Sequence, residues 1–75
     1  MLSVQSLFDK AFSRPRDPRS AAYKTGVKAA LASRIDHVRV VCPFGVGTAE
    51  SDAFFAGTEE GHRIWREAVA EKAEA

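Results

Sequence analysis

Two rows of small residues, with members four positions apart, constrain this chain more than any other feature of its sequence. Ala22, Gly26 and Ala30 form the first row, and Gly57 and Gly61 form the second. Positions four apart lie on one side of an α-helix. Glycine inside a helix costs about 1 kcal/mol relative to alanine, so close approach of another backbone is the expected compensation. The rows therefore predict two helices that pack unusually closely.

Hydrophobic periodicity predicts a short amphipathic helix within residues 1–13. Apolar residues recur there at i, i+3, i+4, i+7 and i+8, namely Val4, Leu7, Phe8, Ala11 and Phe12. Ser3 is the expected N-cap. Arg14 should end the helix, because a residue that precedes proline is disfavoured in the helical conformation.

The rest of the chain divides into three further segments: a helix over 18–34, an extended linker over 35–47 and a helix over 48–72. Asp17 and Pro18 resemble a helix start, and Thr48 is the candidate N-cap of the last helix. The linker is rich in β-branched residues, and whether 38–41 forms a strand is left open. These segments predict an all-α fold in a single domain of residues 1–75.

Phe54 and Phe55 predict a surplus apolar side chain on the last helix. Adjacent helical positions diverge by about 100°, so the two rings cannot both face the core. One of them should be exposed, covered by the N-terminal helix, or buried by a partner. This favours a protein-interaction module, such as an accessory protein of a mobile element or a homodimer, as an alternative function.

The net charge of +1 conceals an asymmetry between the two parts of the chain. Residues 1–47 carry eight basic and three acidic side chains, giving +5, whereas residues 48–75 carry three basic and seven acidic ones, giving −4. A basic region attracts phosphates, although the two parts can equally pair with each other. The candidate RNA-binding residues are Arg14, Arg16, Arg19, Tyr23, Lys24, Lys28, Arg34 and Arg39. Tyr23 and Phe44 can stack on an unpaired base, but core packing is the simpler interpretation.

The sequence argues against an enzyme, a metal site, a cofactor and a small-molecule substrate. A lone cysteine, Cys42, lies in an apolar run, where burial is more typical than pairing with His37 or His62. These three residues lack the paired spacing of a zinc site. Glu59 and Glu60 point in different directions along a helix and make a poor acid–base pair.

A cytoplasmic location is expected, without membrane insertion. No segment approaches the roughly 20 apolar residues that span a bilayer. The N-terminal stretch lacks the apolar run and cleavage site of a signal peptide, and a single cysteine excludes an internal disulfide.

Three motifs occur in a fixed order along residues 22–70: Tyr23-x-x-Gly26, Cys42-Pro43-Phe44 and Phe54-Phe55-Ala56-Gly57. This order resembles the ribosome modulation factor family of small bacterial proteins. Ala22 and Phe44 stand where the family pattern has glycine and tyrosine, and the helix within 1–13 is additional.

The resemblance implies two helices joined by an irregular linker, together with regulation of translation by binding the RNA of the small ribosomal subunit. It also implies that a set of residues forms the structural framework: Tyr23, Gly26, Cys42, Pro43, Phe44, Phe54, Gly57, Gly61 and Trp65. The basic residues near this framework would then contact RNA.

Overall fold

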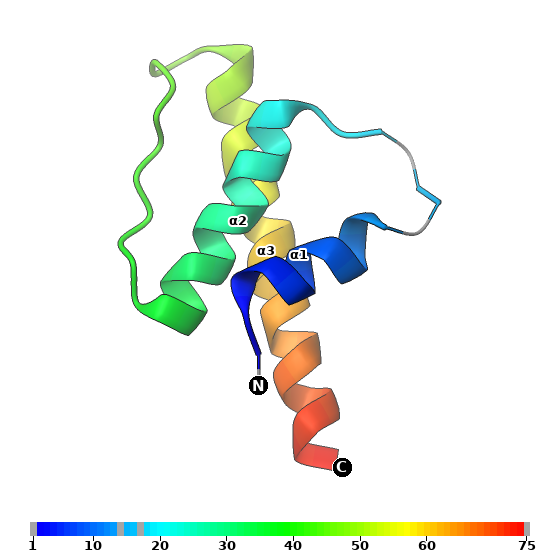
Figure 1. The fold of residues 1–75 in the computed structure, drawn as a ribbon. Helices are drawn as coiled ribbons and strands as arrows, with labels where there is room; N and C mark the ends of the chain where they lie inside the picture. The colour runs from blue at the N-terminus through cyan, green and yellow to red at the C-terminus, as the bar shows by residue number, and fades with distance from the viewer. Residues whose placement is uncertain (1, 14, 17, 75) are drawn as a thin grey trace.

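The computed structural model describes residues 2–13, 15–16 and 18–74, and they form three helices. These are α1 (Val4–Phe12), α2 (Ala21–Asp36) and α3 (Ala49–Glu74). The described residues contain no strand, the segment 38–41 included. The expected all-α fold is confirmed, and the packing of α2 against α3 dominates it (Figure 1).

Helix α1 forms where the apolar periodicity predicts it and docks on the other two helices. The Ser3 hydroxyl accepts a hydrogen bond from the Ser6 backbone N–H at 3.1 Å, as expected for an N-cap. Leu7 and Ala11 are buried, and Leu7 joins a core cluster with Val27 and Leu31. The docked face of α1 is therefore its apolar stripe.

Helix α2 begins at Ala21, so the expected start at Pro18 is wrong. The Ser20 hydroxyl accepts a hydrogen bond from the Tyr23 N–H at 3.2 Å and caps the helix. Asp17, the expected cap, lies outside the described residues, as does Arg14. A capping serine directly before the small-residue row was the better start signal.

Replacing the Ser20 cap with alanine should lower the free energy of unfolding by about 1 kcal/mol, because the Tyr23 N–H loses its partner. Urea denaturation followed by circular dichroism measures this change. Ser33→Ala is the matched control, since the Ser33 hydroxyl makes no hydrogen bond with the described residues and alanine favours helix. Equal stability of the two variants would contradict the assigned cap.

Both long helices extend beyond their expected ends. Ile35 and Asp36, assigned to the linker, continue α2, and α3 runs on to Glu74. Ile35 packs against the core cluster, so burial overrides its weak helix propensity. His37 then ends α2 in a left-handed conformation, with φ of 59°.

Helices α2 and α3 run parallel, and the extended linker makes this possible (Figure 1). Tyr23 faces Gly57 and Val27 faces Gly61, so both helices advance in the same direction. The 16 residues of α2 span about 24 Å, and the chain must return that distance before α3 starts. Thr48 caps α3 as expected, accepting from the Ser51 N–H at 3.1 Å.

The α2–α3 interface is built on glycine, as the two small-residue rows predicted. A Cβ added to Gly26 would lie 2.0 Å from the Phe54 carbonyl oxygen, and one added to Gly57 would lie 2.0 Å from that of Tyr23. At Gly61 an added Cβ would be 2.7 Å from the Val27 carbonyl oxygen. Any side chain at these positions would hold the two backbones apart.

The two adjacent phenylalanines separate as expected. Phe54 is fully buried, whereas 52% of Phe55 is exposed. Among the described residues, no helix is both long and apolar enough to cross a membrane.

Candidate functional site

The structure divides the candidate RNA-binding cations into one that pairs with a buried carboxylate and several that have no ion pair among the described residues. Arg16 pairs with Glu60 of α3. Lys10, which was not a candidate, pairs with Glu71 at 3.7 Å. The other candidates form no ion pair among the described residues. They are Arg19, Lys24, Lys28, Arg34 and Arg39. Pairing between the two parts of the chain is therefore partial.

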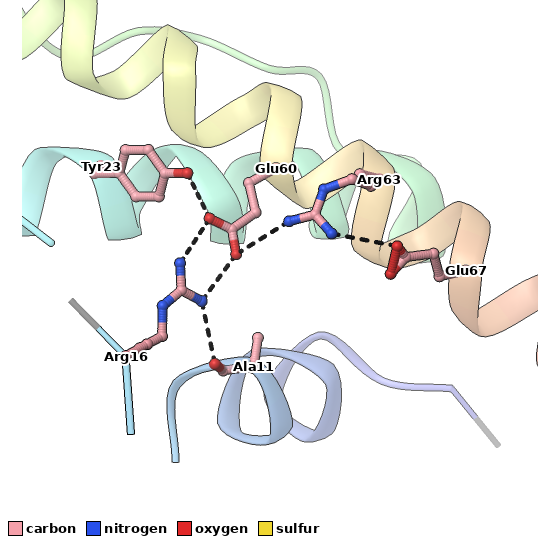
Figure 2. Close-up of polar contacts among 6 residues, drawn as sticks. All are labelled: Ala11, Arg16, Tyr23, Glu60, Arg63 and Glu67. Carbon is pink, nitrogen blue, oxygen red and sulfur yellow. Dashed lines mark hydrogen bonds and ion pairs between the residues drawn. The ribbon is translucent and has the colours of Figure 1, made fainter. Parts of the chain in front are cut away.

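Glu60 lies at the centre of a polar cluster that joins α1, α2 and α3 (Figure 2). Both of its carboxylate oxygens accept hydrogen bonds from Arg16, each at 2.9 Å. The Tyr23 hydroxyl donates to it as well, and an Arg63 nitrogen lies 3.8 Å away. Arg16 also donates to the Ala11 carbonyl at 3.1 Å, which ties the end of α1 to the cluster.

Burial and pairing shift the pKa values within this cluster. The Glu60 side chain is 7% exposed, and the hydrogen bond from Arg16 is the main reason that its pKa lies below the usual value. Burial, followed by the hydrogen bond to Glu60, raises the pKa of Tyr23. At neutral pH Glu60 is therefore a buried carboxylate that accepts hydrogen bonds from a cation and a phenol.

Sequence reasoning missed the role of Glu60. One signal was available, because Glu60 falls between Gly57 and Gly61 in the close-packed part of α3. A carboxylate in a helix–helix interface needs a cationic partner, and the basic residues of the linker before α2 were the nearest candidates.

A second group of side chains forms a surface that we term the cationic face: Phe8, Phe12, Arg19, Lys24 and Lys28. The rings of Phe8 and Phe12 stack with their centres 4.6 Å apart. The Lys28 ammonium lies 4.5 Å from the Phe8 ring centre, and that of Lys24 lies 5.7 Å from the Phe12 ring centre. Phe12, Arg19 and Lys24 line one hollow of about 340 Å³. This surface combines a rigid helix with cations that lie over aromatic rings.

The remaining candidate cations lie elsewhere. The Arg34 guanidinium is 5.0 Å from the Trp65 ring centre, and its Nε donates to His62 Nδ1 at 3.1 Å. Burial, then the charges of Arg34 and Arg66, lower the pKa of His62. Arg39 is exposed in the linker. The structure therefore brings Arg19, Lys24 and Lys28 together and leaves Arg34 and Arg39 apart from them.

Three of the framework residues, Cys42, Phe44 and Phe54, meet where the linker lies against the start of α3. Phe44 and Phe54 make an edge-to-face contact with ring centres 6.2 Å apart. The Cys42 thiol donates to the Phe44 carbonyl at 3.7 Å and lies 3.9 Å from the Ser51 hydroxyl. Neither contact involves a histidine. Among the described residues, no three potential metal ligands gather at one place.

Comparison of this chain with models of protein families, with curated proteins and with solved structures found no match. The resemblance to the ribosome modulation factor family therefore stays a prediction from the three motifs. The geometry of the cationic face is the basis for the function proposed below.

Proposed function

We propose that this chain is a small, non-enzymatic, cytoplasmic regulator that resembles ribosome modulation factor and binds the RNA of the ribosome through its cationic face. It acts by occupying a site and needs no cofactor. The observation that carries this proposal is that Arg19, Lys24 and Lys28 project from one region without a carboxylate partner among the described residues.

The position of these cations suits a phosphate-rich partner. Lys24 and Lys28 lie one turn apart on the exposed side of α2, whose opposite side is fixed against α3 by glycine contacts. Cations on a rigid element contact phosphates with little loss of conformational freedom. Residues 1–47, which supply all the cations of this face, carry a net charge of +5, and this favours an anionic polymer as the partner.

The double substitution Lys24→Ala with Lys28→Ala should weaken binding to small ribosomal subunits and lower the salt dependence of that binding. Each lysine that contacts a phosphate contributes about one unit to the slope of log affinity against log salt, so the slope should fall by about two. Co-sedimentation with purified small subunits between about 50 and 200 mM salt measures both effects.

The matched control for this experiment removes two positive charges from α3. Arg66 and Lys72 are exposed there, outside the cationic face. Arg66→Ala with Lys72→Ala changes the net charge equally and should leave most of the binding intact. If the control loses as much affinity as the α2 variant, net charge and not the cationic face governs binding. No sedimentation of the natural chain at low salt ends the ribosomal proposal.

Phe55 supports a second candidate, a protein-interaction module. Half of its ring is exposed, and the exposed carboxylates Asp52 and Glu59 flank it three and four positions away on α3. A partner for this surface, or a second copy of the chain, would bury the ring. Such binding should depend weakly on salt and be lost in Phe55→Ser.

A further inference from the structure

The aromatic rings of the cationic face are already engaged within the chain. Phe8 and Phe12 stack on each other with an interplanar angle of 28°. Lys28 lies over Phe8, and the guanidinium of Arg16 lies 4.3 Å from the Phe12 ring centre. Arg16 is in turn fixed by two hydrogen bonds to Glu60. An unpaired base would have to displace these groups before it could stack on either ring.

The other aromatic groups near cations are engaged in the same way. The Arg19 guanidinium lies 4.8 Å from the Tyr23 ring centre, and the Tyr23 hydroxyl donates to Glu60. Trp65 is half-buried beneath Arg34. Recognition of single-stranded RNA relies on free aromatic faces and on hydrogen bonds to splayed bases. The cationic side of the molecule offers no free ring among the described residues.

The exposed ring of Phe55 lies in the wrong electrostatic surroundings for a base. Asp52 and Glu59 flank it on the same side of α3, and both are exposed. Two carboxylates beside a ring repel the phosphates that accompany any base. The cationic side thus supplies cations without free rings, and α3 supplies a half-exposed ring flanked by carboxylates.

We infer that, if the proposed function holds, the cationic face takes double-helical RNA and contacts its phosphates, and does not take unpaired bases. Duplex RNA is recognised mainly by its shape and its backbone, which needs cations on a rigid element and no stacking platform. Lys24 and Lys28 on α2 meet that requirement. The preferred ligand is therefore a helical stem, which deepens the proposed function by naming the class of RNA.

Fluorescence anisotropy of the full chain with two labelled RNAs tests this inference. One RNA is a fully paired duplex of about 16 base pairs, and the other is a single strand that cannot pair and has the same number of phosphates. B-form duplexes release about 0.9 counterion per contacted phosphate and single strands about 0.7, and we take the first value for the RNA duplex. With three contacts and equal affinity at 1 M salt, the duplex should bind about sixfold tighter at 50 mM.

Two variants separate phosphate contact from stacking. Lys24→Ala with Lys28→Ala should weaken binding of the duplex, whereas Phe55→Leu should change binding of neither RNA. Equal or tighter binding of the single strand overturns the inference. So does a selective loss of single-strand binding in Phe8→Leu with Phe12→Leu, which would identify those rings as stacking platforms.

The result also distinguishes this inference from the proposed function. Binding to small subunits together with a preference for the single strand would refute the duplex inference alone. Failure to bind either RNA or the small subunit at 50 mM salt would refute the proposed function, and the duplex inference with it.

Discussion

Gly57→Ala is expected to lower the free energy of unfolding by about 3 kcal/mol, a large part of the stability of a chain this short. In an exposed helix interior the same change would stabilise by about 1 kcal/mol. Here the added methyl carbon would lie 2.0 Å from the Tyr23 carbonyl oxygen and 3.1 Å from the Val27 backbone nitrogen. Both are backbone atoms of α2, so no rotation of a side chain relieves the overlap. Urea unfolding followed by circular dichroism measures the loss.

Gly45→Ala provides the matched control for that substitution. A methyl group there would meet the Thr48 Cγ2 at 3.6 Å, an ordinary van der Waals distance, and its φ is not in the left-handed region. Its stability should stay within about 0.5 kcal/mol of the natural chain. A Gly57→Ala variant as stable as this control would show that the helices are farther apart than the structure has them.

Glu60→Gln is expected to cost about 2 kcal/mol at neutral pH, because the amide leaves donors of Arg16 and Tyr23 without full partners. The carboxylate accepts hydrogen bonds from Arg16 and Tyr23 and pairs with Arg63 at 3.8 Å, while only 7% exposed. An amide oxygen carries no charge, and the amide nitrogen is itself a donor that faces other donors. Thermal or urea unfolding at pH 7 measures this cost.

The same substitution should flatten the dependence of stability on pH in acid. The pKa of Glu60 is lower in the folded chain than its ordinary value of 4.5, chiefly because of the hydrogen bond from Arg16. The unfolded chain therefore takes up this proton first as pH falls. The stabilisation is complete above about pH 5 and is lost as pH drops through 4.5 towards the folded pKa. The Glu60→Gln variant should lack this pH-dependent part of the stability.

Glu67→Gln serves as the control for charge alone. Glu67 accepts from Arg63 at 3.2 Å, but its side chain is 59% exposed. Exposed pairs of this kind contribute about 0.5 kcal/mol or less. If Glu67→Gln and Glu60→Gln lower the free energy of unfolding equally and change its pH dependence in the same way, the buried cluster does not stabilise the fold.

The close packing of the two long helices could be predicted because it depends on local pattern. Gly26, Gly57 and Gly61 are costly inside helices, and only a neighbouring backbone explains all three. The N-caps Ser3 and Thr48 could be predicted equally well, since capping depends on residues within four positions of each other. The separation of Phe54 from Phe55 followed from helical geometry alone.

The polar cluster could not be predicted from the sequence, because it depends on contacts between distant segments. Arg16 and Glu60 are separated by 44 positions, and nothing in the sequence around either residue indicates the other. The basic residues were assigned to one set by proximity along the chain. The fold instead places Arg16 against the buried Glu60, Arg34 against Trp65, and the cations of α2 over α1.

The start of α2 shows the limit of local signals when two of them compete. Asp17-Pro18 and Ser20 both resemble helix starts, and propensity does not separate them. The observed start at Ala21 places Ala22, Gly26 and Ala30 against α3 with a capped first turn. Tertiary packing likewise extends α2 through Ile35, where β-branching predicted an end.

The spacing of the glycines also fixes the register in which α3 lies along α2. Gly57 faces Tyr23 and Gly61 faces Val27. A slide of α3 by one turn would bring either Trp65 to the Val27 backbone or the Cβ of Ala53 to that of Tyr23, and neither position has room for a side chain. The glycine contacts therefore oppose a slide of the two long helices past each other by one turn.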